Sequence, residues 1–212
     1  MTARWPRGLY AVTPDEPDTR RLIAKVRLAL AGGAAAVQYR NKPAGPPLRR
    51  LQAAALTEIC REAGVPLIVN DDLPLALEVG AAGVHLGRED GELADARNRL
   101  GPGKLLGASC YDRIDLAVAA AGGGADYVAF GAMFASPTKP AARRAPLTLL
   151  EEARRRTGLP VVAIGGITLD NAGAVVAAGA DGLAVITALF AVDDIAARAR
   201  AFQELFRRSV TP

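Results

Sequence analysis

The sequence predicts a single (β/α)8 TIM barrel domain that spans residues 1–212. Three observations predict this fold class. Short apolar or β-branched runs alternate with longer helical stretches along the chain, glycine ends several of the helical stretches, and no linker divides the chain. Such alternation is typical of parallel strands joined by crossover helices. With 50% hydrophobic residues, the 212-residue chain can bury one large core, although a typical barrel has roughly 250 residues.

Eight runs have the length and the apolar character of buried strands. They are Leu9–Val12, Ala35–Tyr39, Leu67–Asn70, Val84–Leu86, Leu105–Ala108, Tyr127–Phe130, Val161–Ile164 and Leu183–Ile186. The clearest helical stretches between and after them are Arg20–Ala31, Leu48–Ala63, Asp112–Ala121, Leu147–Thr157 and Asp194–Phe206. Eight strand–helix units close naturally into a barrel, and a doubly wound open sheet is the alternative topology.

A repeated glycine–alanine pair follows several helical stretches and precedes the next strand. It occurs at Gly33-Ala34, Gly80-Ala81, Gly124-Ala125 and Gly179-Ala180. Glycine readily takes the left-handed conformation that ends a helix. The repeat therefore indicates one βα unit used several times around the barrel.

The charge balance favours an ordinary globular protein over a nucleic-acid binder. Lys and Arg number 26 against 22 Asp and Glu, which gives a net charge of +4. The arginines at 154–156 fall late in a predicted helix, where they offset the helix dipole, and no basic run is interleaved with aromatic residues. We therefore expect no nucleic-acid partner, and the excess of positive charge suits polyphosphate substrates instead.

Cysteine usage and hydropathy indicate a cytoplasmic, soluble protein. Cys60 and Cys110 have no metal-ligand or redox spacing, and we expect Cys60 to be a buried thiol. Residues 1–8 lack the apolar segment of a signal peptide, and no apolar run is long enough to span a membrane. We expect no membrane association, and a homo-oligomer remains open.

Polar residues at the end of the second predicted strand are candidates for anion binding. In barrels of this kind the active site lies where strands end and βα loops begin. Side chains of a strand alternate between its two faces, so Gln38, Arg40 and Lys42 share a face. If Tyr39 packs outward, these three groups converge on the barrel mouth. Two cations and an amide can bind an anion, and a salt-bridged strand end is the structural alternative.

Carboxylates follow the third and fourth predicted strands. Asp71 and Asp72 come directly after Asn70, and Asp90 follows the next strand. Two carboxylates at adjacent strand ends would repel each other unless a hard divalent cation lay between them, and Mg2+ needs only one or two carboxylates besides substrate phosphates and water. We expect Asp71 and Asp90 to hold Mg2+. Asp72 precedes Leu73-Pro74 and is the expected helix cap, and capping of the fourth helix is the alternative role of Asp90.

The later strands end in residues suited to a phosphate. Glycines at 165 and 166 follow the seventh strand and Thr187 follows the eighth, the place where barrels often bind phosphate through backbone amides. The loop after the sixth strand contains Ser136, Thr138 and Lys139, and it is either an anion-binding segment or an ordinary exposed loop. His85 either faces the barrel mouth or is hydrogen-bonded in the core, and we assign it no catalytic role.

The ordered set of these motifs resembles the thiamine phosphate synthase family over nearly the whole chain. The motifs are Q-Y-R-N-K at 38–42, N-D-D at 70–72, G-V-H-L-G-R-E-D at 83–90, S-P-T-K at 136–139 and I-G-G-I-T at 164–168. The family consists of barrels that join 4-amino-2-methyl-5-hydroxymethylpyrimidine pyrophosphate to 4-methyl-5-(2-phosphooxyethyl)thiazole, or its carboxylated form. Thiamine phosphate and pyrophosphate are the products, so the resemblance implies a transferase whose partners are two small-molecule substrates.

The resemblance also implies a role for each site residue. Contacts to the pyrimidine and its pyrophosphate would come from Gln38, Arg40, Lys42, Asn70, Ser109 and Lys139. Among these, the catalytic groups would be Arg40, Lys42, Ser109 and Lys139. Asp71 and Asp90 would hold Mg2+. Contacts to the thiazole phosphate would come from Ser136, Thr138, Gly166, Ile186 and Thr187.

Three positions depart from the family pattern. Ser136 stands where the family commonly has Thr, and Thr187 where it commonly has Ser, so both positions keep a hydroxyl. Arg88 replaces a residue that is usually Gln and adds positive charge near the metal site. Two other functions are consistent with this fold: a thiazole tautomerase, which would not need Asp71, Asp90 and Lys139 together, and a non-catalytic protein that binds thiamine precursors.

Overall fold

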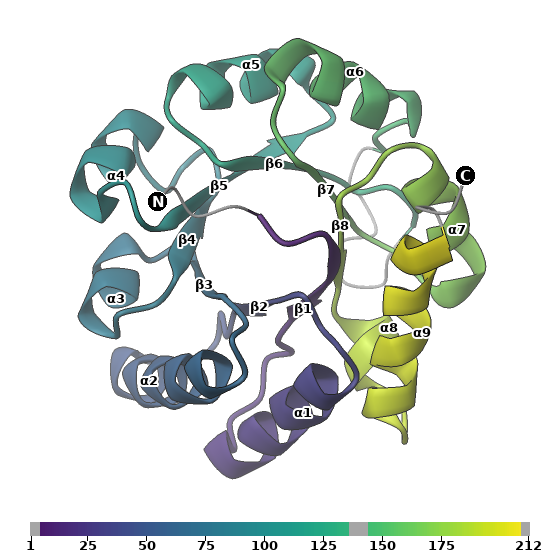
Figure 1. The fold of residues 1–212 in the computed structure, drawn as a ribbon. Helices are drawn as coiled ribbons and strands as arrows, with labels where there is room; N and C mark the ends of the chain where they lie inside the picture. Colours follow the sequence, from purple (N-terminus) through teal and green to yellow (C-terminus); the bar gives the residue numbers. More distant parts are fainter. Residues whose placement is uncertain (1–4, 136–143, 209–212) are drawn as a thin grey trace.

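The structure is a computed structural model that describes residues 5–135 and 144–208, and its parallel strands close into one barrel (Figure 1). The strands are β1 (Gly8–Val12), β2 (Ala36–Tyr39), β3 (Leu67–Asn70), β4 (Gly83–Leu86), β5 (Leu105–Tyr111), β6 (Tyr127–Phe130), β7 (Val161–Ile164) and β8 (Gly182–Val185). Each strand pairs with its neighbours in the sequence, and β8 pairs with β1 in parallel. The closed order confirms the predicted barrel and excludes the open doubly wound sheet.

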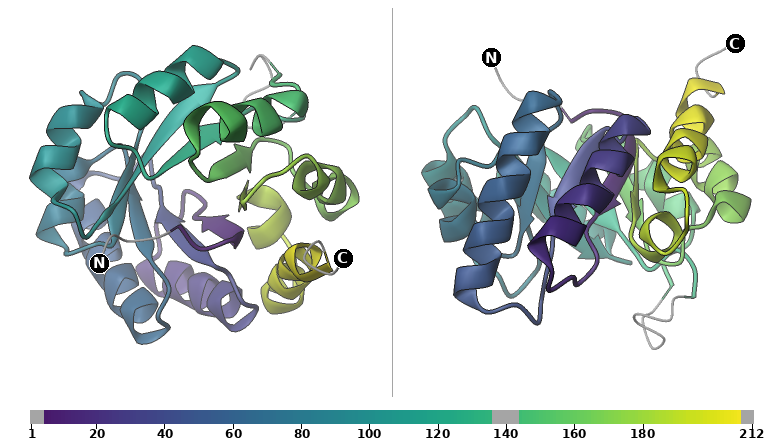
Figure 2. Two further views of the ribbon diagram at one scale, coloured as in Figure 1. Left: turned by 45° about the horizontal axis from the view of Figure 1, so that its top comes forward. Right: turned by 90° about the horizontal axis from the view of Figure 1, so that it is seen from below.

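The helices surround the barrel on its outside (Figures 1 and 2). They are α1 (Thr19–Ala31), α2 (Pro46–Glu62), α3 (Leu73–Glu78), α4 (Leu93–Leu100), α5 (Ile114–Gly122), α6 (Thr148–Thr157), α7 (Leu169–Ala177), α8 (Thr187–Phe190) and α9 (Ile195–Arg208). No helix among the described residues is long and apolar enough to cross a bilayer.

Two differences from the predicted boundaries bear on the site. β5 continues three residues past Ala108 to Tyr111, with an irregular register between Ser109 and Tyr111, so Ser109 belongs to a strand. β8 ends at Val185, and Ile186 leaves the strand with φ −111° and ψ −85° to begin the short helix α8. The prediction had placed Ile186 inside the strand because its side chain is apolar and β-branched.

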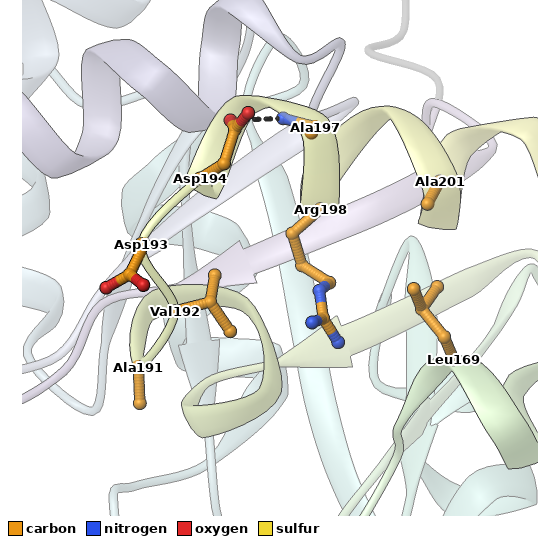
Figure 3. A pocket seen from close by; sticks show the side chains of 8 residues that line it. All are labelled: Leu169, Ala191, Val192, Asp193, Asp194, Ala197, Arg198 and Ala201. Atoms are coloured by element: carbon orange, nitrogen blue, oxygen red, sulfur yellow. Dashed lines mark hydrogen bonds between the residues drawn. The ribbon is translucent and has the colours of Figure 1, made fainter.

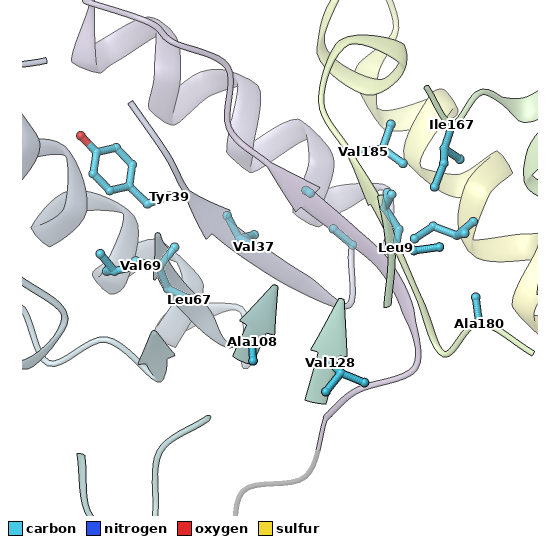
Figure 4. Close-up of a cluster of buried hydrophobic side chains, with 14 of the residues drawn as sticks. Leu9, Val37, Tyr39, Leu67, Val69, Ala108, Val128, Ile167, Ala180 and Val185 are labelled. Atoms are coloured by element: carbon cyan, nitrogen blue, oxygen red, sulfur yellow. The ribbon is translucent and has the colours of Figure 1, made fainter. Parts of the chain in front are cut away.

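Apolar side chains form two separate layers. The outer layer fills the space between sheet and helices and includes Leu9, Val37, Tyr39 and Val128 (Figure 4). The inner layer fills the barrel and includes Trp5, Tyr10, Ile68, Tyr127 and Val162. Strand side chains alternate between the two layers, as Leu9 and Tyr10 show.

The predicted glycine–alanine repeat forms one recurring helix end. The four glycines have φ values of 88°, 67°, 84° and 95°, in the left-handed region that favours glycine. The N–H of each following alanine bonds to a carbonyl five residues back, as Ala34 does to Ala29 and Ala81 to Ala76. These bonds satisfy helix carbonyls that would otherwise lack a partner, and they set the start of the next strand.

Trp5 closes the barrel at the amino ends of the strands. Its ring lies 4.0 Å from that of Tyr127 and 4.9 Å from that of Tyr10, and it lies close to Gly182 at the start of β8. The described residues that lead into β1 lie over the barrel at this end (Figure 1). The carboxyl ends of the strands open at the opposite end, where the candidate site lies.

Candidate active site

The end of β2 has the predicted orientation. Tyr39 points outward, where its hydroxyl donates to Gln52 Oε1 of α2 at 3.0 Å. Gln38 therefore faces the barrel interior, and its Nε2 donates to Tyr10 Oη at 2.8 Å. Gln38 is buried, so its amide is held at a fixed place on the floor of the barrel mouth.

The two cations that follow β2 have acidic partners from neighbouring strand ends. Arg40 Nη1 lies 3.0 Å from Asp15 Oδ1, which also accepts the backbone N–H of Lys42 at 3.0 Å. Lys42 Nζ lies 3.4 Å from Asp71 Oδ2. The sequence left two alternatives open for this strand end, an anion-binding site and a set of salt bridges. This geometry is consistent with both. Asp15 was missed by sequence reasoning, and its position three residues after β1 was the available signal.

Asp71 and Asp90 meet at the ends of β3 and β4. Burial and the neighbouring Asp71 carboxyl raise the pKa of Asp90, and the two side chains lie within hydrogen-bonding reach of each other. Asp71 has φ 62°, unusual for a residue with a side chain, and its N–H donates to the His85 carbonyl at 2.8 Å. Two carboxyls held this close favour either a shared proton or a bound cation.

This acidic pair fits a magnesium ion that is completed by other oxygen ligands. No group of three or more His, Cys, Asp and Glu side chains in residues 5–135 and 144–208 forms a metal cluster. Mg2+ commonly uses one or two carboxylates and takes its other oxygens from water and substrate phosphates. Asp71 and Asp90 are therefore the residues that would hold it.

The capping roles of Asp72 and Asp90 differ. Asp72 is the N-cap of α3, and its Oδ1 accepts the Leu75 N–H at 3.0 Å, as the sequence predicted. Asp90 does not cap α4, because Glu92 occupies that N-cap and the Asp90 carboxylate accepts the Gly87 N–H at 2.7 Å instead. The alternative capping role of Asp90 is wrong, which leaves its carboxyl beside Asp71.

Ser109 and His85 lie inside the barrel mouth. His85 Nε2 lies 2.9 Å from Ser109 Oγ, and His85 Nδ1 lies 3.0 Å from Tyr127 Oη. Burial lowers the pKa of His85 to about 4 and raises the pKa of both Tyr10 and Tyr127. His85 is thus a neutral, hydrogen-bonded ring at ordinary pH. Tyr10 and Tyr127 were not predicted, although their polar tips on inward-facing strand positions were a readable signal.

Asn70 completes this side of the mouth. It is the last residue of β3, it is half-buried, and it lies opposite His85 in the register of β3 and β4. A pocket of about 50 Å³ lies beside these strand ends. Its lining includes Arg40, Lys42, Asn70 and Asp71, so four predicted site residues share one depression.

The ends of β7 and β8 form a second region of the barrel mouth. Gly165 and Gly166 have φ values of 100° and 64°, and a Cβ on Gly166 would lie 2.4 Å from the Ala135 carbonyl oxygen. These glycines are therefore required by the close approach of the segment after β6. Asn171 Nδ2 donates to the Gly166 carbonyl at 2.9 Å and holds this turn above α7. Thr187 begins α8 directly after Ile186.

Three predicted residues, Ser136, Thr138 and Lys139, lie outside the residues that the structure describes. A larger hollow of about 540 Å³ lies outside the barrel between Leu169 of α7, the segment after α8 and the first turns of α9 (Figure 3). The predicted site residues do not line it.

Comparison with known proteins identifies the family. The family model described as thiamine monophosphate synthase matches residues 9–189. A thiamine-phosphate synthase of Azoarcus sp. (strain BH72) is 58% identical over 94% of this chain and 97% of that protein. A second, from Aromatoleum aromaticum, is 57% identical over 94% of this chain and 96% of that protein.

Solved structures agree with this result. Thiamine phosphate pyrophosphorylase from Pyrococcus furiosus is 33% identical, covers 96% of this chain and 97% of its own, and superposes with a TM-score of 0.85. A 3-hexulose-6-phosphate synthase with a TM-score of 0.70 is only 19% identical over 92% of this chain and 98% of its own, so it shows the barrel fold alone. The resemblance inferred from the ordered motifs is confirmed: this chain belongs to the thiamine monophosphate synthase family.

Proposed function

We propose that this chain is a transferase that condenses 4-amino-2-methyl-5-hydroxymethylpyrimidine pyrophosphate with 4-methyl-5-(2-phosphooxyethyl)thiazole to give thiamine phosphate and pyrophosphate. The carboxylated thiazole is an alternative acceptor, whose carboxyl group would leave as CO2. One observation supports this most strongly: the pair Asp71 and Asp90 lies beside the cation Lys42 at the strand ends. This arrangement suits a metal-bound pyrophosphate, and relatives that match almost end to end are named thiamine-phosphate synthase.

The pyrophosphate would lie over the ends of β2, β3 and β4. Arg40 offers a planar fork of donors and Lys42 a compact charge, which suit phosphate oxygens in different ways. Asp71 and Asp90 would hold Mg2+, which when bound neutralises the charge that develops on the leaving pyrophosphate. Lys139 would add a further positive charge, as the family resemblance implies.

The pyrimidine would lie deeper, on the floor of the barrel mouth. Gln38 and Ser109 there offer an amide and a hydroxyl whose positions are fixed by buried partners. Asn70 adds a second amide at the end of β3. An amide can donate to a ring nitrogen and accept from an exocyclic amine, so this set suits an aminopyrimidine.

The thiazole phosphate would lie at the other region, over β7 and β8. Gly166, Ile186 and Thr187 would surround the phosphate, with Ser136 and Thr138 toward the thiazole substituent. The two regions of the mouth thereby separate a pyrophosphate that leaves from a phosphate that stays. This separation favours transfer between two substrates over isomerisation of one, as a tautomerase would perform.

The reaction needs charge stabilisation and alignment. The bond between the pyrimidine methylene carbon and the pyrophosphate oxygen breaks first, and the oxygen keeps the electron pair. Arg40 and Lys42 stabilise the anion that forms. The thiazole nitrogen then uses its lone pair to bond the methylene carbon, so no general base is required. The walls of the mouth hold the two rings in line.

Both substrates are phosphorylated small molecules that do not cross membranes unaided, so we place the reaction in the cytoplasm. The direct test incubates the purified full chain with both substrates and Mg2+ and measures pyrophosphate release. Release that requires both substrates is expected. Binding of both without release would contradict the proposal and favour the non-catalytic binding protein.

The metal assignment has its own test. Asp71→Asn should reduce Mg2+-dependent turnover at least about a hundredfold, since it removes charge stabilisation of the leaving group. The matched control is Asp95→Asn, which changes an exposed carboxylate on α4 that pairs with Arg99. Thermal unfolding measured at increasing Mg2+ concentration gives a second readout. The rise in unfolding temperature with Mg2+ should be lost in Asp71→Asn and kept in Asp95→Asn. Retained stabilisation would contradict the assignment.

A further inference from the structure

Five polar side chains form an unbroken hydrogen-bond chain across the inside of the barrel. From β2 to β5, its four links join Gln38 Nε2 to Tyr10 Oη (2.8 Å), Tyr10 Oη to Tyr127 Oη (3.0 Å), Tyr127 Oη to His85 Nδ1 (3.0 Å) and His85 Nε2 to Ser109 Oγ (2.9 Å). The chain crosses five strands, and four of its members are buried. Its two ends, Gln38 and Ser109, are two of the three groups assigned to the pyrimidine.

The first link fixes the direction of the others. Gln38 donates to Tyr10, so the single hydroxyl hydrogen of Tyr10 is available for Tyr127. When Tyr10 uses this hydrogen, Tyr127 accepts it and has its own hydroxyl hydrogen left for His85 Nδ1. The neutral imidazole consequently has its proton on Nε2, which donates to Ser109. The hydroxyl hydrogen of Ser109 is not used in the chain and can point toward a ligand.

Reversal of one link favours reversal of all of them, because any other arrangement leaves a buried donor or acceptor unsatisfied. If the Gln38 carbonyl faced Tyr10, each hydroxyl would donate the other way, His85 would have its proton on Nδ1, and Ser109 would donate to Nε2. A mixed arrangement would either leave one tyrosine hydroxyl hydrogen without an acceptor or set two donors or two acceptors against each other at His85, in a buried site where unsatisfied groups are costly. The two ends of the chain are therefore coupled.

We propose that Tyr10, Tyr127 and His85 are positioning residues that couple the hydrogen-bond polarity of Gln38 to that of Ser109. In the direction described, Gln38 presents its carbonyl oxygen and one N–H, and Ser109 presents a donor. A ligand that offers an amine to Gln38 and an acceptor to Ser109 matches both ends at once. A heteroaromatic ring with an amino group and ring nitrogens has this pattern, and this identification of the ligand rests on the proposed function.

Packing holds the chain in place. The Trp5 ring lies over Tyr127 with centroids 4.0 Å apart, and His85 stacks on the same tyrosine at 5.5 Å. Gly107 of β5 makes room for the bond between Tyr127 and His85, because a Cβ there would lie 2.3 Å from Tyr127 Oη and 2.5 Å from His85 Nδ1. The rings are thus confined to one arrangement, and the proton positions are what remains to be set.

The test uses the fact that His85 is the single histidine of the chain. The full-length protein with ¹⁵N-labelled histidine, without substrates, gives a long-range ¹H–¹⁵N spectrum that identifies the protonated ring nitrogen. The expected result is the Nε2–H tautomer. The Nδ1–H tautomer, or a mixture, in the wild-type protein would overturn the proposed direction.

The coupling is tested by changes at a distance. Gln38→Met removes the amide that sets the direction, four links away from Ser109, and should convert the single tautomer to a mixture. Tyr127→Phe should do the same, and Tyr10→Phe serves if that variant does not fold. Gln203→Met is the matched control, because Gln203 Oε1 accepts a hydrogen bond from Leu9 N–H and takes no part in the five-residue hydrogen-bond chain. Its loss should leave the histidine spectrum unchanged. An unchanged tautomer in Gln38→Met would overturn the coupling.

Kinetics give a second readout. Gln38→Met and Ser109→Ala should each reduce kcat/KM for the pyrimidine pyrophosphate about tenfold, and together by clearly less than the product of the two effects. When Tyr127→Phe is also present, the combined reduction from Gln38→Met and Ser109→Ala should equal the product of their separate reductions. The same shortfall from that product with and without Tyr127→Phe would contradict the proposal. The ligand-free spectrum separates the two hypotheses: the expected tautomer without turnover contradicts only the proposed function, and turnover with a mixed tautomer contradicts only the coupling.

Discussion

Gly107→Ala should destabilise the protein strongly, although the change adds one methyl group to a strand. The new Cβ would lie 2.1 Å from Tyr127 Cζ and 2.5 Å from His85 Nδ1. Atoms in contact lie about 3.5–4.0 Å apart, so the buried rings would have to move by roughly 1.4 Å or more. Overpacking of this kind costs about 1–3 kcal/mol, and breaking the link between Tyr127 and His85 adds about 1–3 kcal/mol.

The free energy of unfolding of Gly107→Ala should therefore fall by about 2–6 kcal/mol. Urea unfolding followed by fluorescence of the single tryptophan, Trp5, measures this, because that ring packs on Tyr127. The matched control is Gly173→Ala, since Gly173 is exposed on α7 with nothing within 4 Å of an added Cβ. It should stabilise the protein by about 0.5–1 kcal/mol through helix propensity. A Gly107→Ala midpoint equal to that of the wild type would refute the close packing described for the barrel interior.

Three further predictions concern single charged or titratable groups. Because the pKa of Asp90 is raised, the folded state binds this proton more tightly than the unfolded state. The free energy of unfolding should therefore fall as pH rises from 3.8 through the folded pKa. Asp90→Asn should remove this part of the pH profile. The pKa of His85 is lowered to about 4, so stability should fall as pH decreases from 6.5 toward 4; a profile unchanged in His85→Asn would contradict this. Asp15→Ala removes the acceptor of Arg40 and of the Lys42 N–H, and steady-state kinetics should show kcat/KM for the pyrophosphate substrate reduced about tenfold. An unchanged value would show that Arg40 is positioned without this partner.

The fold could be predicted because local signals repeat around the barrel. Each glycine–alanine pair ends a helix by the same backbone geometry, and short apolar strands alternate with amphipathic helices, so eight similar units were recognisable. Short or polar helices such as α4 carry weaker periodicity, and the N-cap residue of α4, Glu92, makes no side-chain capping bond that a sequence pattern could have indicated. Ile186 was misplaced because an apolar, β-branched side chain suits both a strand and the turn after it.

The candidate site was predictable where residues follow directly after strands. Gln38, Arg40, Lys42 and Asp71 could be assigned to one mouth because strand side chains alternate and strand ends meet. The interior chain was not predictable, since Tyr10, Tyr127 and His85 come from three strands that are distant in sequence. Their contact depends on the barrel register and on the space that Gly107 leaves. Asp15 was missed for the same reason, because its partner Arg40 follows the end of a different strand.

The most direct measurement of the central claim is product analysis of a single reaction. The purified full chain, Mg2+, the pyrimidine pyrophosphate and the thiazole phosphate are incubated together, and thiamine phosphate and pyrophosphate are quantified by mass spectrometry. A thiamine-phosphate synthase must form the two products in equal amounts and form neither when one substrate is omitted. Pyrophosphate release without thiamine phosphate, or a rearranged thiazole phosphate as the sole product, would contradict the account.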